Sequence, residues 1–101
     1  MPLSKRWSSF TKDTIGRERN NYGVYELGDT NGDVHYIGEG EVKGRLLAHF
    51  VRRSDPIPGT KYYRCEYTGG KAAAVSRQNA LLAVYKRIHG KLPKYNQRSR
   101  N

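Results

Sequence analysis

Two runs of β-forming residues, 22–28 and 34–38, flank a polar stretch that contains an Asn-Gly pair. Asn-Gly is a preferred two-residue loop of β-hairpins, so the pattern predicts a hairpin that turns at Asn31 and Gly32. The antiparallel pairs that follow are Thr30 with Asp33, Leu27 with Tyr36, and Tyr25 with Gly38. Because opposed residues project to the same face, Tyr25 and Tyr36 share a face, with open space at Gly38.

Helical spacing of apolar residues predicts two helices farther along the chain. The first covers residues 41–53, and its apolar stripe consists of Val42, Leu46 and Phe50. A polar stripe beside it consists of Arg45, His49 and Arg52. The second helix follows Gly70 and is expected to stop at Gly90, a residue typical of helix C-termini.

The segment 61–68 alternates as a strand, which places Tyr63, Cys65 and Tyr67 on one face. A short helix is expected around residues 9–17, with Trp7 and Phe10 anchoring the N-terminal segment to the core. The order hairpin, helix, strand, helix predicts an α+β fold with a small sheet of about three strands, antiparallel or mixed, flanked by helices. The 101 residues are expected to form a single domain, with a segment 1–19, a core 20–96 and a basic tail 97–101.

The charge is strongly positive and unevenly placed. The net charge is +10, and no Asp or Glu follows Glu66. A basic balance of this kind favours an acidic partner, and its concentration in one third of the chain can mark a surface that faces phosphates. We therefore expect a nucleic-acid partner, DNA first and RNA as the alternative.

Other chemistry is sparse in the sequence. The single cysteine, Cys65, forms no internal disulfide, and no Cys-x-x-Cys or His/Cys cluster suggests zinc. No apolar run approaches the roughly 20 residues of a membrane span, and the N-terminus lacks the apolar core of a signal peptide. These features predict an intracellular protein, cytoplasmic or nucleoid-associated, without a membrane partner. His35 is expected on the surface of its strand.

The hairpin carries two tripeptides, GVY at residues 23–25 and YIG at residues 36–38, with ten residues between them. In this pattern the sequence resembles a GIY-YIG nuclease domain, with Val24 as a conservative exchange. Arg45, seven residues after Gly38, matches the arginine of the family's next helix, and His49 matches a histidine that many members have one turn later. The closing motif of the family matches PKYN, which ends at Asn96. The resemblance covers roughly residues 20 to 96.

This resemblance implies metal-dependent hydrolysis of nucleic-acid phosphodiesters, with 5′-phosphate and 3′-hydroxyl products. It implies that Tyr25 acts as the general base, with Tyr36 as its partner near the nucleophile. Arg45 would neutralise the scissile phosphate, with His49 assisting. The family also has a glutamate on the last helix that binds one divalent cation, Mg²⁺ or Mn²⁺.

The residue types suit that chemistry. The planar guanidinium of Arg45 matches phosphate oxygens. A tyrosine base needs a pKa below its ordinary value of about 10, and Lys43, Arg45 and His49 are candidates to lower it. The glycines Gly23 and Gly38 are costly in strands unless something must approach the backbone. Contacts to the nucleic acid are expected from Lys43, Arg52, Arg53, Arg77, Lys86, Lys94 and Asn96.

A glutamine, Gln78, stands where the family has its metal-binding glutamate, beside the apolar stripe of the long helix. A neutral amide oxygen is a poor sole ligand for Mg²⁺. Three explanations are open. An engineered inactivating substitution is favoured because the change is isosteric and the other positions are intact; the alternatives are a natural non-catalytic relative, or another acid that binds the metal. Glu39 and Glu41 are nearest to the motif, although they lie on a different element from the family's ligand.

The sequence thus favours an endonuclease that Gln78 inactivates or impairs. The alternative is a non-catalytic nucleic-acid-binding module of the same fold. A small basic structural protein, such as a ribonucleoprotein component, gives no reason for the pairs Tyr25/Tyr36 and Arg45/His49. No separate DNA-reading module is recognisable, which favours structure-specific or weakly specific cutting.

Overall fold

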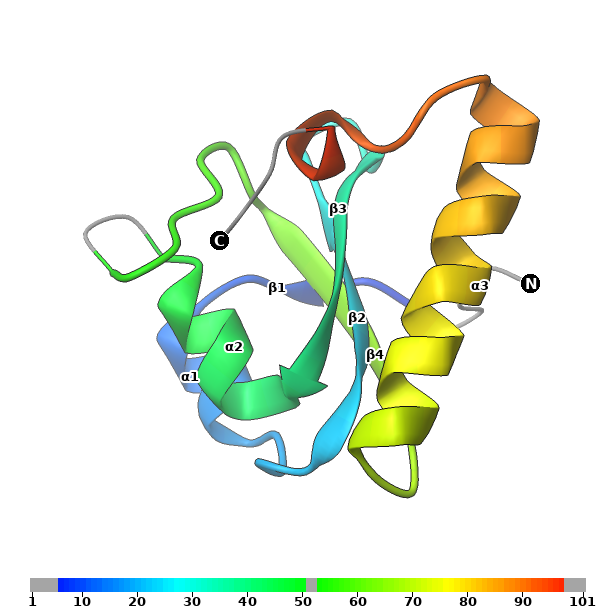
Figure 1. Cartoon of the computed structure of the whole chain (residues 1–101). Coiled ribbons are helices and arrows are strands. Elements are labelled where there is room, and N and C mark those ends of the chain that lie inside the picture. Colours follow the sequence, from blue (N-terminus) through cyan, green and yellow to red (C-terminus); the bar gives the residue numbers. More distant parts are fainter. Residues whose placement is uncertain (1–5, 51–52, 98–101) are drawn as a thin grey trace.

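A four-stranded antiparallel sheet forms the centre of the molecule, with helices on both of its faces (Figure 1). The computed structural model describes residues 6–50 and 53–97. The strands are β1 (Ser8–Ser9), β2 (Tyr22–Gly28), β3 (Val34–Glu41) and β4 (Tyr62–Tyr67), in the order β1-β4-β2-β3. The helices are α1 (Lys12–Gly16), α2 (Val42–Ala48), α3 (Lys71–His89) and a 3₁₀ turn, η1 (Lys94–Asn96). The α+β class is confirmed.

The hairpin has the predicted register but a wider turn. Leu27 pairs with Tyr36 and Tyr25 with Gly38, and the register then shifts after Leu27. The predicted pair of Thr30 with Asp33 is wrong, because the loop spans residues 29–33. The loop is wider because of Asp29, whose carboxylate accepts hydrogen bonds from the backbone N–H groups of Asn31 and Asp33 at 2.9 and 3.0 Å. Such side-chain bonds offer the backbone an alternative to the strand ladder.

The N-terminal segment adds a strand that the sequence pattern did not predict. The two residues of β1 pair with β4, and a run this short carries no readable periodicity. Thr11 then caps α1 by accepting a hydrogen bond from the N–H of Thr14. Phe10 anchors the segment as predicted, since its ring stacks on Phe50 at 4.4 Å.

The two longer helices end differently. α3 stops at Gly90, whose φ of +79° is the left-handed conformation expected of a C-terminal glycine. α2 ends at Ala48, several residues before its predicted end at residue 53. The backbone N–H of Asp55 donates to the Ala48 carbonyl at 3.0 Å, so the chain folds back onto the end of the helix.

Two cores lie on opposite faces of the sheet. The larger one packs under α1 and α2 and contains Ile15, Tyr25, Leu27, Tyr36, Val42, Leu46, Ile57, Tyr63 and Cys65. The smaller one joins Val24 and Ile37 to Leu81 of α3. In Figure 1, α1 and α2 accordingly lie on one side of the sheet and α3 on the other. Within residues 6–50 and 53–97, none of the helices combines the length and the hydropathy that a membrane span requires.

The prediction that His35 lies on the surface is wrong. Its side chain is buried, and its Nε2 lies 2.8 Å from the hydroxyl of Thr60. The ring of Tyr95, in η1, meets it edge-on at 5.2 Å. The segment after α3 therefore covers this end of β3.

Candidate functional site

A buried hydrogen bond between Tyr25 and His49 forms the centre of the candidate site. The Tyr25 hydroxyl lies 2.6 Å from Nε2 of His49, and both side chains are fully buried. Nδ1 of His49 lies 2.7 Å from the carbonyl oxygen of Asp55. Because a carbonyl only accepts, Nδ1 carries the proton, and Nε2 of the neutral ring accepts from the Tyr25 hydroxyl.

His49 is fully buried, so it does not share an exposed polar stripe of α2 with Arg45. The physical reason is the end of α2 at Ala48, after which His49 turns inward beneath the returning chain. Burial also raises the pKa of the Tyr25 hydroxyl well above its ordinary value, with a further increase from Tyr36 and an opposing effect of Arg45. The lowering expected from nearby cations is outweighed by desolvation.

Tyr36 shares a face with Tyr25, as the hairpin register predicts. Its ring lies 6.2 Å from that of Tyr25 and meets His49 edge-on at 5.2 Å. The space over Gly38 is filled by the Tyr25 ring, since a Cβ on Gly38 would lie 2.5 Å from the Tyr25 hydroxyl. This glycine therefore makes room for a side chain of the site.

Gly23 is needed for a different reason, the close approach of two strands. A Cβ on Gly23 would lie 2.4 Å from the backbone carbonyl oxygen of Glu66 in β4. The strand glycines of both motifs are thus explained by packing inside the domain.

Arg45 projects from α2 and is held by Asp55. Its Nη2 donates to Oδ2 of Asp55 at 3.1 Å, while 39% of the side chain stays exposed. Gly40 lies against it with φ +138°, and a Cβ there would meet Cγ of Arg45 at 2.8 Å. Asp55 and Gly40 are site residues that the sequence analysis missed, although an Asp-Pro pair after a predicted helix was a usable signal.

A pocket of about 570 Å³ brings the predicted residues together. It lies at the end of β3, between α2 and the start of α3. Its lining consists of Tyr22, Tyr36, Glu39, Gly40, Glu41, Gly44, Arg45, Lys71 and Gln78. Tyr25 and His49 are not part of this lining, and Tyr36 is the member of their ring cluster that reaches the pocket.

The domain of unknown function DUF7508 matches residues 1–87 of the chain. The chain belongs to this family. No curated protein matches it.

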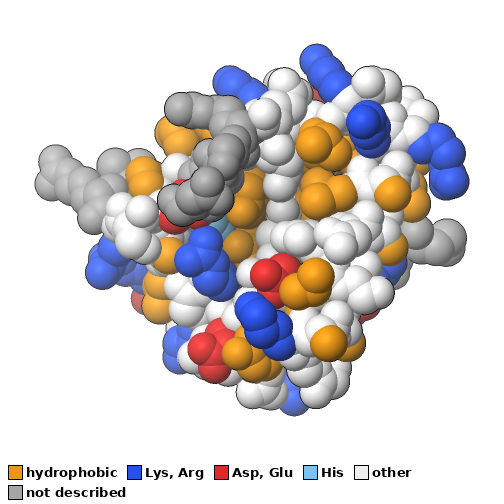
Figure 2. Space-filling view, in the orientation of Figure 1, with side chains coloured by type: hydrophobic (Ala, Val, Ile, Leu, Met, Phe, Trp, Pro, Cys, Tyr) orange, Lys and Arg blue, Asp and Glu red, His pale blue; other side chains and the backbone are white. Residues whose placement is uncertain are grey.

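The residues of this DUF7508 domain that are expected to bind phosphate differ in their surroundings. Arg53, Lys86 and Lys94 are exposed, and Lys43 on α2 is half-buried. Arg77 is instead bound to the carboxylate of Glu66, at 3.0 Å. Arg52 lies outside the described residues. On the face that Figure 2 shows, Lys and Arg side chains surround hydrophobic ones, with acidic side chains among them in the lower half.

Asn96 is committed to the backbone of β3. Its Oδ1 accepts from the N–H of Ile37 at 2.8 Å, and its Nδ2 donates to the Ile37 carbonyl at 2.9 Å. Both polar groups of the amide are thus used within this DUF7508 domain, so Asn96 is a bridging residue rather than a free phosphate ligand.

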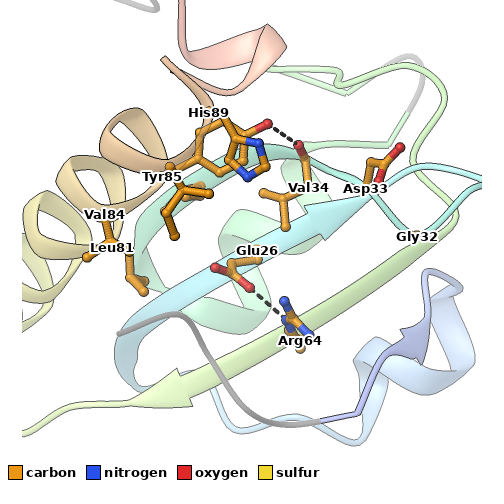
Figure 3. A pocket seen from close by; sticks show the side chains of 11 residues that line it. Glu26, Gly32, Asp33, Val34, Arg64, Leu81, Val84, Tyr85 and His89 are labelled. Carbon is orange, nitrogen blue, oxygen red and sulfur yellow. Dashed lines mark hydrogen bonds and ion pairs between the residues drawn. The ribbon is translucent and has the colours of Figure 1, made fainter. Parts of the chain in front are cut away.

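A second pocket, of about 500 Å³, lies between α3 and the sheet (Figure 3). Apolar side chains of α3, among them Leu81 and Val84, face an ion pair of Glu26 with Arg64, whose nitrogen and oxygen lie 2.6 Å apart. None of the predicted catalytic residues lines it. The candidate chemistry therefore gathers in the pocket at Tyr36 and Arg45.

Few side chains of this DUF7508 domain offer oxygen ligands to a divalent cation in the candidate site. Among the described residues, no cluster of three His, Cys, Asp or Glu side chains could hold a metal. Gln78 lines the Tyr36 pocket and offers an amide oxygen. In the same pocket, Oε1 of Glu39 is buried and has no hydrogen-bond partner among the described residues. Such orphaned oxygens call for a water or an ion.

Proposed function

We propose that this DUF7508 domain hydrolyses phosphodiester bonds in nucleic acid, DNA first, as its resemblance to GIY-YIG nucleases implies. One observation carries the proposal. Tyr36 and Arg45 line the same pocket, and Tyr36 packs on the buried pair of Tyr25 and His49. Tyrosines that only pack in the core give no reason for an arginine that Asp55 orients at the same pocket.

In this proposal Arg45 binds the scissile phosphate. Its guanidinium is oriented by Asp55 yet retains exposed donors, so it can approach phosphate oxygens in a fixed geometry. Fixed positive charge stabilises the transition state because no reorganisation is needed as negative charge grows. Lys71 lines the same pocket and adds a second cation.

Proton transfer is assigned to Tyr36, Tyr25 and His49 together. Because burial raises the pKa of Tyr25, its hydroxyl is protonated near neutral pH and no tyrosinate is available as a base. In this proposal the hydroxyl of Tyr36, which lines the pocket, takes the proton of the attacking water and passes its own to Tyr25, as Tyr25 gives its proton to Nε2 of His49. The carboxylate of Asp55, with Oδ2 3.7 Å from Nδ1, stabilises the imidazolium that forms. Tyr36, at the pocket, orients the water.

The resulting hydroxide attacks phosphorus, the bond to the leaving oxygen breaks, and that oxygen departs with a proton from solvent as a 3′-hydroxyl. A divalent cation, when bound, supplies charge stabilisation at the leaving oxygen. Gln78 at the matched position supplies a neutral oxygen, and neither the proton transfer nor the binding of phosphate by Arg45 depends on it.

A second candidate function is nucleic-acid binding without cleavage. The observation that favours it is the missing carboxylate at Gln78. The net charge of +10 supports binding in either case.

A cleavage panel separates the two. The chain and its Gln78→Glu variant are incubated with labelled single-stranded, duplex and branched DNA and with RNA, in Mg²⁺ or Mn²⁺. Nicking by Gln78→Glu that Arg45→Ala abolishes supports the nuclease. If Gln78→Glu binds these substrates and cuts none, the non-catalytic function is supported and the nuclease proposal fails.

A further inference from the structure

Two glutamates flank Val24 on the neighbouring strands, and their carboxylates differ in their bonding partners. Glu39 of β3 and Glu66 of β4 are both register partners of Val24 in β2. They share the face on which Val24 packs against Leu81 of α3. The carboxylate of Glu66 is bound by Arg77 of α3 at 3.0 Å. No described residue does the same for Oε1 of Glu39.

An unpartnered buried carboxylate oxygen is costly, because it loses water without gaining a hydrogen bond. The neighbouring cations do not compensate Glu39. Within the described part of the chain, no ion pair joins Glu39 to Arg45 or Lys71, and Arg45 is engaged by Asp55. A ligand from outside the protein is therefore the fitting partner for this oxygen.

The pocket supplies a second oxygen from the opposite side. Gln78 on α3 and Glu39 on β3 both line it, together with Arg45 and Tyr36. A carboxylate and an amide oxygen are hard ligands that suit Mg²⁺ and Mn²⁺, and these ions usually keep several waters or substrate phosphates as their other ligands.

We propose that Glu39 and Gln78 together bind a divalent cation in this pocket. The negative charge that position 78 lacks is supplied from β3, across the gap between strand and helix. The role of this cation beside the phosphate rests on the proposed nuclease function, but its binding does not. Gln78 then contributes a neutral oxygen ligand, and the carboxylate of Glu39 contributes the negative charge of the site.

Metal binding tests this directly. Mn²⁺ is titrated into the full chain by calorimetry, and Tb³⁺ is followed by luminescence excited through tyrosine, since Tyr22 and Tyr36 line the pocket. Glu39→Gln should weaken binding of Mn²⁺ at least about tenfold, since even outer-shell partners of a metal are worth about 10- to 100-fold in affinity. Glu66→Gln, with the same charge change on the same face, should bind as the unmodified chain does.

A charge exchange provides the second arm. Gln78→Glu should bind Mn²⁺ more tightly than the unmodified chain, and the double variant Glu39→Gln/Gln78→Glu should restore the affinity that Glu39→Gln loses. Restoration also shows that the loss did not come from misfolding. Unchanged affinity in Glu39→Gln, or an unmodified chain that binds no Mn²⁺ at millimolar concentration, would overturn the proposal.

The outcomes for metal site and nuclease remain distinguishable. If Mn²⁺ binding depends on Glu39 while no variant cuts nucleic acid, the metal site stands and the nuclease proposal fails. If Arg45-dependent cleavage occurs while Glu39→Gln binds Mn²⁺ unchanged, the nuclease stands and this metal site fails.

Discussion

The hydroxyl of Tyr25, in β2, donates to Nε2 of His49 across 2.6 Å in the fully buried interior of the larger core. His49 follows the last residue of α2, so this bond ties the hairpin to the end of the helix that carries Arg45. Geometry and stability of the candidate site therefore depend on the same pair of residues.

Replacing His49 with alanine is expected to destabilise the fold by roughly 3 kcal/mol. The change leaves a cavity and removes the partner of two buried groups, the Tyr25 hydroxyl and the Asp55 carbonyl. Urea unfolding measures the loss. In a double-mutant cycle with Tyr25→Phe, the pair should show a coupling of about 1 kcal/mol, and additive losses would contradict the hydrogen bond.

Gly38→Ala is expected to destabilise the domain by about 1–3 kcal/mol, because the new methyl group meets the buried Tyr25 ring. The matched control is Gly44→Ala in α2, where a Cβ lies 3.4 Å from Oδ1 of Asn20. That change should be neutral or stabilising by up to about 1 kcal/mol, since alanine favours helix over glycine. Equal melting temperatures for the two variants would show that the Tyr25 ring does not occupy this space.

Alkaline pH should destabilise the fold more steeply than its surface charge alone requires. Burial raises the pKa of Tyr25 in the folded state, whereas in the unfolded chain it releases its proton near pH 10. Above that pH the unfolded state binds fewer protons, so the free energy of unfolding falls by up to about 1.4 kcal/mol per pH unit for this group. Below pH 10 this contribution is fully present.

Urea unfolding between pH 8 and 12 measures this slope, and Tyr25→Phe should lessen it. Tyr63 and Tyr67, whose pKa values burial and Glu18 also raise, should retain their share of the slope in that variant. The interpretation fails for Tyr25 if the two slopes are equal.

Arg45→Ala, made in the Gln78→Glu background, is expected to reduce cleavage by about 100- to 1,000-fold, the usual effect of losing one fixed transition-state donor. The free energy of unfolding should change by less than about 1 kcal/mol, because the ion pair with Asp55 is partly exposed. Lys43→Ala on the same helix serves as control and should weaken substrate binding only modestly. Loss of folding in Arg45→Ala would assign the residue a structural role.

The sequence predicts those parts of the fold that local signals determine, such as turn residues and the spacing of apolar residues. The register of Tyr25 with Gly38 follows from the position of the Asn-Gly pair between two β-rich runs, and Gly90 ends α3 as a C-terminal glycine should. The turn differs because the Asp29 side chain bonds locally, which no periodicity contains. The burial of His49 and His35 depends on segments that fold back from distant parts of the chain.

The same limit applies to Glu39. Its position two residues before the end of β3 is plain from the sequence, yet its proximity to the pocket of Gln78 depends on how α3 crosses the sheet. Glu39 and Gln78 lie on different elements, far apart in the sequence, and only the packing of α3 on the sheet brings them to one pocket.

The two hydrogen bonds between Asn96 and Ile37 have a consequence for association. β3 is an edge strand, and exposed edges invite a further strand from another chain. The carboxamide of Asn96 offers one donor and one acceptor to the same residue, as a peptide group of a fifth strand would. The chain thereby pairs its own edge at Ile37 with a side chain, which leaves fewer backbone groups of β3 for a strand of another molecule.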